Sequence, residues 1–293
     1  MRCLVLAQAA AKHGIPARFL IYGDADTTAL VKTAGFPVVL RPPLPLATQA
    51  TEVEGIVETG EIAVLDFIHS RSLAELRDAP LMLAAWRRKA RQVMLIDGSA
   101  GQALRTYLAE PDVDAVLAPY AGEVMPSAAP FRALFGPTYF ILAEGYRHLP
   151  TRVARANADR VLVTCGGADC YGITSMVLHG LEQITRRLQV RVAVGPLFGT
   201  ELRAELAKLT TNSHHAVTRL DAATGLAESM LWCDLAVATS GLTKYELAAA
   251  GAPALLLSVD AAQEEVNHAF LAEGTAHSLG VHDVITTIDV KRA

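Results

Sequence analysis

Short apolar runs alternate with amphipathic stretches along most of the chain, which is the pattern of strands alternating with helices. In the first half these runs predict strands over residues 17–22, 38–40, 62–66, 93–97 and 114–117. In the second half they predict strands over residues 160–164, 190–194, 215–219, 235–238 and 254–258. Because the runs are apolar at nearly every position, we expect parallel sheets with helices on both faces.

A charged segment over residues 147–159, which contains Pro150, separates the two series of strands. It predicts a linker at residues 148–157 between a domain over residues 1–147 and a domain over residues 158–293. Both halves alternate strands with helices. The expected fold class is therefore α/β, with two doubly wound, Rossmann-like domains facing a ligand cleft.

Both ends of the chain depart from the usual form of such domains. The chain opens on a predicted helix over residues 1–13, whereas a doubly wound domain ordinarily begins with a strand followed by a ligand-binding turn. Residues 283–293 predict no long closing helix. We expect either that Met1 is an internal methionine, with the first strand upstream of it, or that this domain is unusually built. The first alternative is favoured.

Composition and charge exclude several classes of protein. The chain is 52% hydrophobic and 19% charged, which supports full cores and argues against disorder. A net charge of −4 without a long basic run argues against nucleic acid as a partner. No apolar stretch reaches membrane-spanning length and no signal peptide stands out. We therefore expect a cytoplasmic protein without a membrane span; the sequence does not specify its oligomeric state.

The sequence offers no spacing typical of a metal centre. The four cysteines lack CxxC spacing and are expected to be reduced thiols: Cys3, Cys165, Cys170 and Cys233. The pair His214-His215 is expected to lie in a solvated turn rather than to bind a metal. Neither a metal nor a cofactor is predicted.

Two glycine-containing turns each lie between a predicted strand and a predicted helix. The first follows the strand at residues 160–164 and consists of Gly166, Gly167, Ala168 and Asp169. The second follows the strand at residues 235–238 and consists of Ser240, Gly241, Leu242 and Thr243, before a short helix that carries Glu246. Such turns leave the first N–H groups of the helix free to bind phosphate. Two of them in one half of the chain predict a nucleotide diphosphate site.

Several segments share their order and spacing with a known family. They are Met1-Arg2-Cys3, Val64-Leu65-Asp66, Leu95-Ile96-Asp97, Leu134-Phe135-Gly136-Pro137-Thr138-Tyr139 and the two glycine turns. Over essentially its whole length the chain resembles the pseudaminic-acid-pathway UDP-sugar hydrolases. These enzymes release UDP from 2,4-diacetamido-2,4,6-trideoxy-β-L-altropyranose and are relatives of the MurG glycosyltransferases. The resemblance implies the GT-B fold, with UDP bound by the C-terminal domain and the sugar by the N-terminal one.

The resemblance also implies roles for individual residues. Backbone N–H groups near Gly166-Gly167 and over Gly241, Leu242 and Thr243 would bind the UDP phosphates, and Glu246 would accept hydrogen bonds from the ribose. Gln263 lies in the last loop on the nucleotide side. Plainer roles compete with these: a helix-terminal carboxylate for Glu246, a turn or cap for Asp169 and a packed ring for Tyr139. Asp66 and Asp97 end strands on the expected ligand side.

Departures from the family leave its chemistry open in this chain. The family's general base is a His in a Gly-x-Gly-His-x-Met-Arg-Cys pattern, and this chain begins at the Met. Ile68 and Ala262 replace a Tyr and an Asn, and losing a positioned proton-transfer group costs about 10²–10⁴ in rate. Asp66 and His69 are the remaining catalytic candidates. A helix-surface or turn role is expected for His69 and Asn267.

Three functions follow from these observations. The main prediction is a hydrolase that acts on a UDP-sugar, impaired in the chain as given. One alternative is a GT-B glycosyltransferase with a reshaped sugar pocket, and another is a protein that binds a UDP-sugar without turnover. A Rossmann oxidoreductase is disfavoured because neither turn has the G-x-G-x-x-G spacing of a dinucleotide site.

Overall fold

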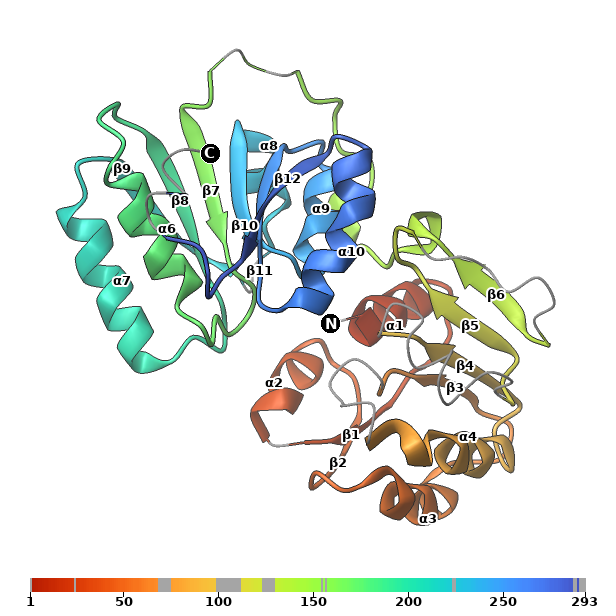
Figure 1. Ribbon diagram of the computed structural model, residues 1–293. Coiled ribbons are helices and arrows are strands. Elements are labelled where there is room, and N and C mark those ends of the chain that lie inside the picture. The colour runs from red at the N-terminus through yellow and green to blue at the C-terminus, as the bar shows by residue number, and fades with distance from the viewer. Residues whose placement is uncertain are drawn as a thin grey trace. The chain divides into compact units, whose positions relative to one another are not determined.

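The computed structural model describes residues 2–23, 25–67, 75–98, 112–122, 130–153, 155, 157–222, 225–286 and 289 (Figure 1). Its contacts divide the chain into two compact units, Met1–Ile141 and Leu142–Ala293. The division lies before the predicted linker, because Tyr146 and Leu149 pack against the core of the C-terminal unit. None of the helices in the described ranges combines the length and the apolar character needed to cross a bilayer.

The N-terminal unit alternates helices with short parallel strands. Its helices are α1 (Arg2–Lys12), α2 (Ala25–Thr33), α3 (Leu46–Ile56) and α4 (Ala79–Arg87), with the 3-10 turns η1 (Glu75–Asp78) and η2 (Pro137–Tyr139). Its strands are β1 (Phe19–Tyr22), β2 (Val38–Arg41), β3 (Ile62–Leu65), β4 (Gln92–Ile96), β5 (Ala115–Ala118) and β6 (Arg132–Phe135). The core lies where α3, η1 and α4 pack on β3, β4 and β5.

The strands of this unit form two parallel sheets instead of one. β1 pairs with β2, and a separate sheet has the order β3-β4-β5-β6. In the usual doubly wound order, the first strand of the domain would lie between β1 and β3. Among the described residues, neither β1 nor β3 pairs with a strand on that side.

The C-terminal unit contains one six-stranded parallel sheet. Its strands are β7 (Arg160–Thr164), β8 (Gln189–Val194), β9 (Ala216–Asp221), β10 (Leu235–Thr239), β11 (Ala254–Ser258) and β12 (Ala276–Val281). Its helices are α6 (Ile173–Leu181), α7 (Thr200–Asn212), α8 (Ala227–Trp232), α9 (Thr243–Ala249) and α10 (Ala261–Ala272), preceded by the 3-10 turn η3 (Glu144–Tyr146). The strand order β12-β11-β10-β7-β8-β9 is the doubly wound order of a Rossmann-like unit.

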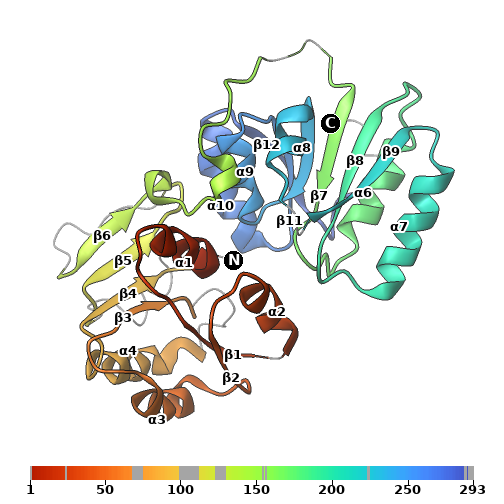
Figure 2. The ribbon, with the colours of Figure 1, turned by 180° about the vertical axis from the view of Figure 1, so that it is seen from behind.

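Helices cover both faces of this sheet, as the continuous apolar runs predict (Figure 2). Successive side chains of a strand point to opposite faces. Accordingly, Val161 and Val163 of β7 join a core with α6 and α7, whereas Leu162 joins a second core with α8 and α9. All five residues of β11 are buried. The ten predicted strands are confirmed to within a few residues; β6 and β12 were not predicted.

Candidate functional site

The order of strands defines a topological switch point in the C-terminal unit. From β7 the chain proceeds outward through β8 and β9, and it then crosses to β10 and proceeds outward on the other side. Ligands of open α/β sheets bind outside the carboxyl ends of the strands where the order reverses. Both predicted turns lie at this point, since β7 and β10 are neighbours and an added Cβ on Gly166 would meet Thr239 Oγ1 at 3.8 Å.

The turn after β7 is closed by its own carboxylate. Asp169, at φ 43°, accepts hydrogen bonds from the backbone N–H groups of Ile173 and Thr174, both at 2.8 Å. It therefore caps α6, which is the plainer of the two roles expected for it. Its negative charge already occupies the helix terminus that would attract an anion. The exposed Gly166 and Gly167 can still offer main-chain groups to a ligand.

The turn after β8 supports the turn after β7. Leu197 donates its backbone N–H to Gly167 O at 2.9 Å, and Arg203 donates to Gly195 O at 2.7 Å. The main chains approach so closely that a Cβ on Gly195 would lie 2.3 Å from Gly167 O. This contact fixes the position of the first glycine turn, and it leaves no room for any side chain at residue 195.

The turn after β10 has no carboxylate cap. Ser240 is buried and anchored by its backbone N–H to Leu257 O at 2.9 Å, and no side chain caps α9 at Leu242. Among the described residues, no acceptor is assigned to the backbone N–H groups of Gly241, Leu242 and Thr243. Of the two predicted turns, this one leaves its amides available to an anion.

Glu246 presents a carboxyl group in the same region, one turn into α9. It is partly buried and interacts with the Tyr146 hydroxyl, which also lies 3.6 Å from Met230 Sδ. Burial raises the pKa of Glu246 to about 7, against the smaller opposing effect of the Tyr146 hydrogen bond. Sequence reasoning missed Tyr146 because it lies far along the chain in η3, where no pattern marks it.

Helix α10 contacts this turn through Asn267, which donates to Ser240 Oγ at 2.8 Å. Gln263 donates its backbone N–H to the Asp260 side chain at 2.8 Å, while its Oε1 lies 3.4 Å from Val259 N. Ala262 is exposed. Asn267 is fully buried, so the helix-surface or turn role expected for it is wrong. Its amide instead belongs to a polar network beneath the Ser240 turn.

A second polar cluster lies in the N-terminal unit, at the carboxyl ends of three neighbouring strands. Asp66, Asp97 and Tyr120 follow β3, β4 and β5, and Arg2 from α1 reaches them. Arg2 donates to Asp66 Oδ1 at 2.6 Å and Oδ2 at 3.2 Å, and also to the Tyr120 hydroxyl. Asp97 is fully buried. Both oxygens of the catalytic candidate Asp66 are thus engaged by a guanidinium.

Two other expectations concern this unit. Tyr139, expected to be a packed aromatic, is 45% exposed, so that expectation is wrong. The remaining catalytic candidate, His69, and the neighbouring Ile68 lie outside the described residues.

Solved structures identify the architecture. MurG from Acinetobacter baumannii matches with a TM-score of 0.69 at 14% identity, over 99% of this chain and 85% of that chain. Arabidopsis thaliana UGT89C1 complexed with UDP-L-rhamnose matches with a TM-score of 0.59 at 11% identity, over 99% of this chain and 84% of that chain. Medicago truncatula UGT71G1 complexed with UDP-glucose matches with a TM-score of 0.59 at 10% identity, over 99% of this chain and 85% of that chain. The chain has the GT-B fold.

At these identities the likeness shows the fold alone. No protein-family model matches the sequence, and the search of curated proteins found no significant match. The GT-B fold expected from the sequence resemblance is confirmed. The hydrolase family named there is not confirmed and stays a prediction.

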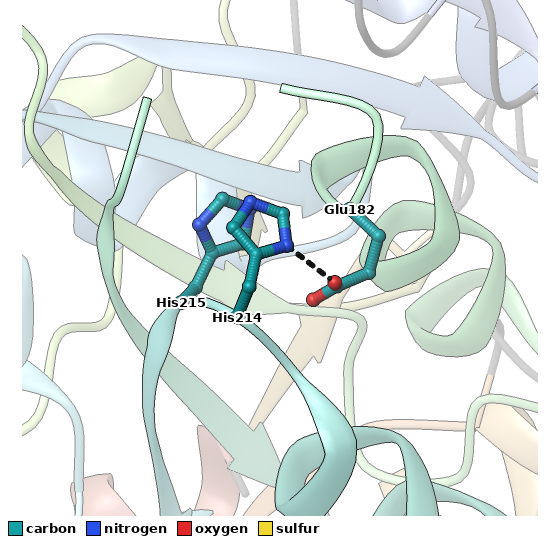
Figure 3. A group of neighbouring side chains, drawn as sticks. All are labelled: Glu182, His214 and His215. Atoms are coloured by element: carbon teal, nitrogen blue, oxygen red, sulfur yellow. Dashed lines mark hydrogen bonds and ion pairs between the residues drawn. The ribbon is translucent and has the colours of Figure 1, made fainter. Parts of the chain in front are cut away.

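At the amino-terminal edge of the C-terminal GT-B sheet, Glu182, His214 and His215 lie together (Figure 3). His215 is buried: its Nδ1 accepts from Leu188 N at 3.2 Å and its Nε2 donates to Leu181 O at 2.8 Å. The solvated turn expected for both histidines is therefore wrong for His215. Each ring nitrogen is already engaged, so a metal ion would have to displace existing hydrogen bonds.

His214 makes one hydrogen-bond contact through each of its two ring nitrogens. Its Nε2 lies 2.9 Å from Ile184 O and its Nδ1 lies 2.8 Å from Glu182 Oε2. Both partners are acceptors, so both ring nitrogens must carry protons to satisfy them. The Ile184 carbonyl and the Glu182 carboxylate raise the pKa of His214 above its usual value.

The two contacts of the His214 ring predict a pH-dependent contribution to stability. A histidine whose pKa is raised in the folded state stabilises the fold fully below its unfolded pKa of about 6.5. This contribution is lost as the pH rises through the folded pKa. We expect His214→Gln to lower the Tm more at about pH 5.5 than at about pH 8. Thermal melts of both proteins measure this, with His13→Gln at an exposed position as the control. An equal loss of Tm at both pH values would show that the contacts of His214 do not depend on its charge.

Three of the four cysteines are poor nucleophiles in this fold. All four are free, as expected. Burial raises the pKa of Cys165 to about 12, that of Cys3 to about 12 and that of Cys233 to about 11. These thiols are protonated at neutral pH and therefore unreactive.

Proposed function

We propose that this chain is a UDP-sugar-dependent enzyme of the GT-B kind, a glycosyltransferase that binds the nucleotide in its C-terminal unit. The observation that carries the proposal is the pairing of an uncapped turn with the partly buried Glu246 at the switch point of the sheet. The fold supports it, because solved proteins of this fold are complexed with UDP-L-rhamnose and UDP-glucose.

In the proposed complex, the diphosphate is bound by the backbone N–H groups of Gly241, Leu242 and Thr243. Aligned peptide dipoles at a helix start favour an anion there. The Glu246 carboxylate accepts hydrogen bonds from the ribose hydroxyls. The backbone of Gly166, Gly167 and Ala168 borders the same ligand from β7, with Asp169 serving as the cap of their turn. Gln263 borders it from α10.

Transfer to an acceptor is favoured over hydrolysis by the state of Asp66. Hydrolysis of the predicted kind needs a base to activate water, and both Asp66 oxygens accept from Arg2. In a transferase, the N-terminal unit would bind the sugar and its acceptor, a division of roles that the family resemblance implies. Binding without turnover is the third possibility.

Replacing Glu246 by Gln tests the ribose contact. Loss of a charge-assisted hydrogen bond should weaken UDP binding by roughly 1.5–3 kcal/mol, or about 10- to 150-fold in Kd. The carboxylate is the acceptor, so protonation through a pKa of about 7 should abolish it. Wild-type affinity should therefore fall about tenfold from about pH 8 to about pH 6. Calorimetry over this range measures both effects.

Glu246→Gln also controls for the titration of UDP itself. UDP changes its protonation identically in the wild-type and variant titrations, so the difference between their two pH profiles of affinity reports the titration of Glu246. The variant should also be more stable than wild type above pH 7, since a raised carboxyl pKa costs stability as the pH rises from about 4.5 to about 7. Absence of UDP binding in a folded wild type would refute the proposal.

Turnover separates the three functions. UDP release from a panel of UDP-sugars should require an added acceptor if the chain is a transferase. Release without an acceptor would instead establish a hydrolase. UDP-sugar binding with neither reaction would indicate a binding protein.

A further inference from the structure

A network of polar side chains, all buried except the partly exposed Glu264, lies beneath the turn that follows β10. We call it the buried relay and define it as Lys244, Asn267, Ser240, Ser258 and Glu264. Lys244 is 4% exposed, Ser240 3%, and Asn267 and Ser258 are fully buried. These residues come from α9, α10, the end of β11 and the turn that follows β10, so three elements and a turn meet in it.

Chemistry fixes the orientation of the Asn267 amide. The Lys244 ammonium can only donate, so Asn267 presents Oδ1 to Lys244 Nζ at 3.0 Å. Its Nδ2 then donates to Ser240 Oγ at 2.8 Å and to Ser258 Oγ at 3.0 Å. The opposite orientation would leave the ammonium facing another donor.

The two hydroxyl groups follow in turn. Ser258 donates its proton to Glu264 Oε2 at 2.7 Å. Ser240 Oγ lies 2.9 Å from Ser258 Oγ, whose proton is already used, so Ser240 must be the donor. The relay is therefore directed, from the ammonium through Asn267 and both serines to the carboxylate. The hydroxyl proton of Ser240 is not available to a ligand, and Ser240 acts through its backbone.

Burying the Lys244 ammonium at this position carries a desolvation penalty. Lys244 Nζ lies 5.1 Å from the centre of the Phe270 ring and 5.9 Å from that of Tyr245. Burial lowers the pKa of Lys244 to about 8, and Glu264, the charged group facing it from α10, only partly offsets this. An apolar side chain of the same length would fill the space without a desolvation penalty. The charge therefore calls for an electrostatic partner.

We propose that Lys244 is a positioning residue that holds the Ser240–Gly241 turn through Asn267 and supplies the buried counter-charge for an anionic diphosphate bound there. This inference rests on the proposed function. In this proposal Lys244 acts on the ligand through the hydrogen bonds of the buried relay and not by direct contact. A bound anion favours the ammonium form, and the ammonium form favours the anion.

The proposal predicts an alkaline limb in the pH profile of UDP binding, that is, a loss of affinity as the pH rises. An anion at the turn raises the pKa of Lys244 above its value of about 8 in the free protein, so binding takes up a proton. The contribution of Lys244 to affinity should be present below about pH 8 and should be lost as the pH rises above it. Glu246 loses its contribution by protonation below about pH 7, so the site should have a bell-shaped profile whose two limbs belong to different residues.

Calorimetry with UDP and uridine, from about pH 6 to about pH 9.5, tests this in wild type, Lys244→Met and Lys244→Arg. Wild-type affinity for UDP should fall about tenfold between about pH 8 and about pH 9.5. Lys244→Met should bind UDP about tenfold more weakly at pH 7, without the alkaline limb. Lys244→Arg, charged throughout, should keep its UDP affinity at high pH. Uridine lacks phosphate, so its affinity should be nearly unchanged in each variant.

Lys208→Met is the matched control, since Lys208 is an exposed lysine of α7 whose loss changes the net charge equally. Parallel pH profiles in wild type and Lys244→Met, or equal losses for UDP and uridine, would overturn the proposal and leave the proposed function standing. If the methionine variant does not fold, the arginine variant decides: an alkaline limb like that of wild type would overturn it. No UDP binding by wild type would refute both proposals.

Discussion

Replacing Arg2 by Met is expected to destabilise the N-terminal unit by about 3–5 kcal/mol. Arg2 is 6% exposed and its side chain pairs with Asp66, which is 13% exposed. Removing one partner of such a pair leaves the other carboxylate buried without its counter-charge, and that penalty exceeds the net worth of the intact pair. It also removes a hydrogen bond to the Tyr120 hydroxyl. Urea unfolding followed by circular dichroism measures the loss.

Arg18→Met is the control in the same unit. Arg18 pairs with Glu61 at 2.7 Å, but both side chains are about a third exposed. An exposed pair contributes about 0–1 kcal/mol, so this variant should lose little. Adding Asp66→Asn to Arg2→Met should recover part of the stability, because the uncompensated charge is removed. Equal effects of Arg2→Met and Arg18→Met would show that the cluster contributes no more than a surface pair.

Replacing Gly195 by Ala is expected to destabilise the C-terminal unit by about 3 kcal/mol or more. The added Cβ would lie 2.3 Å from Gly167 O and 2.7 Å from Gly166 O. These are main-chain atoms that cannot rotate away, so one of two hydrogen-bonded turns must move. The movement would displace Gly166 and Gly167 from the switch point. We therefore expect weaker UDP binding in any fraction that folds, measured by calorimetry alongside urea unfolding.

Gly199→Ala is the matched control four residues further along. A Cβ there meets nothing within 4 Å, and Gly199 has a φ of −61°, which any residue adopts. Its change in stability should lie within about 1 kcal/mol of zero. If Gly195→Ala were equally mild, the close approach of the two turns would not be a constraint on the fold.

The strands that sequence analysis missed share a place in the structure. β6 and β12 are both edge strands. A central strand is buried on both faces and between neighbours, and its sequence is almost wholly apolar, as in the Val161–Thr164 stretch of β7. An edge strand has a neighbour on one side only, so its sequence can be mixed: no residue of β12 is fully buried. Apolar runs therefore predict the interior of a sheet better than its edges.

The candidate site was predictable where it depends on short segments. Gly166, Gly241 and Glu246 each follow a strand by a fixed number of residues, and parallel strands bring their carboxyl ends to one edge. The errors concern side chains whose surroundings come from distant segments. Asn267 was expected at a surface and is buried, whereas Tyr139 was expected to pack and is exposed.

By itself, the sequence determined the α/β class, the order of most elements and the location of both turns, because periodicity and turn chemistry are local properties. Only the tertiary structure decided which polar side chains meet. The Arg2–Asp66 pair joins residues 64 positions apart, the Lys244–Asn267 contact joins residues 23 apart, and Tyr146 reaches Glu246 from an earlier segment. Contacts of this kind depend on which strands are neighbours and which helix faces pack together, and the alternation of apolar and polar residues along one segment carries no record of either.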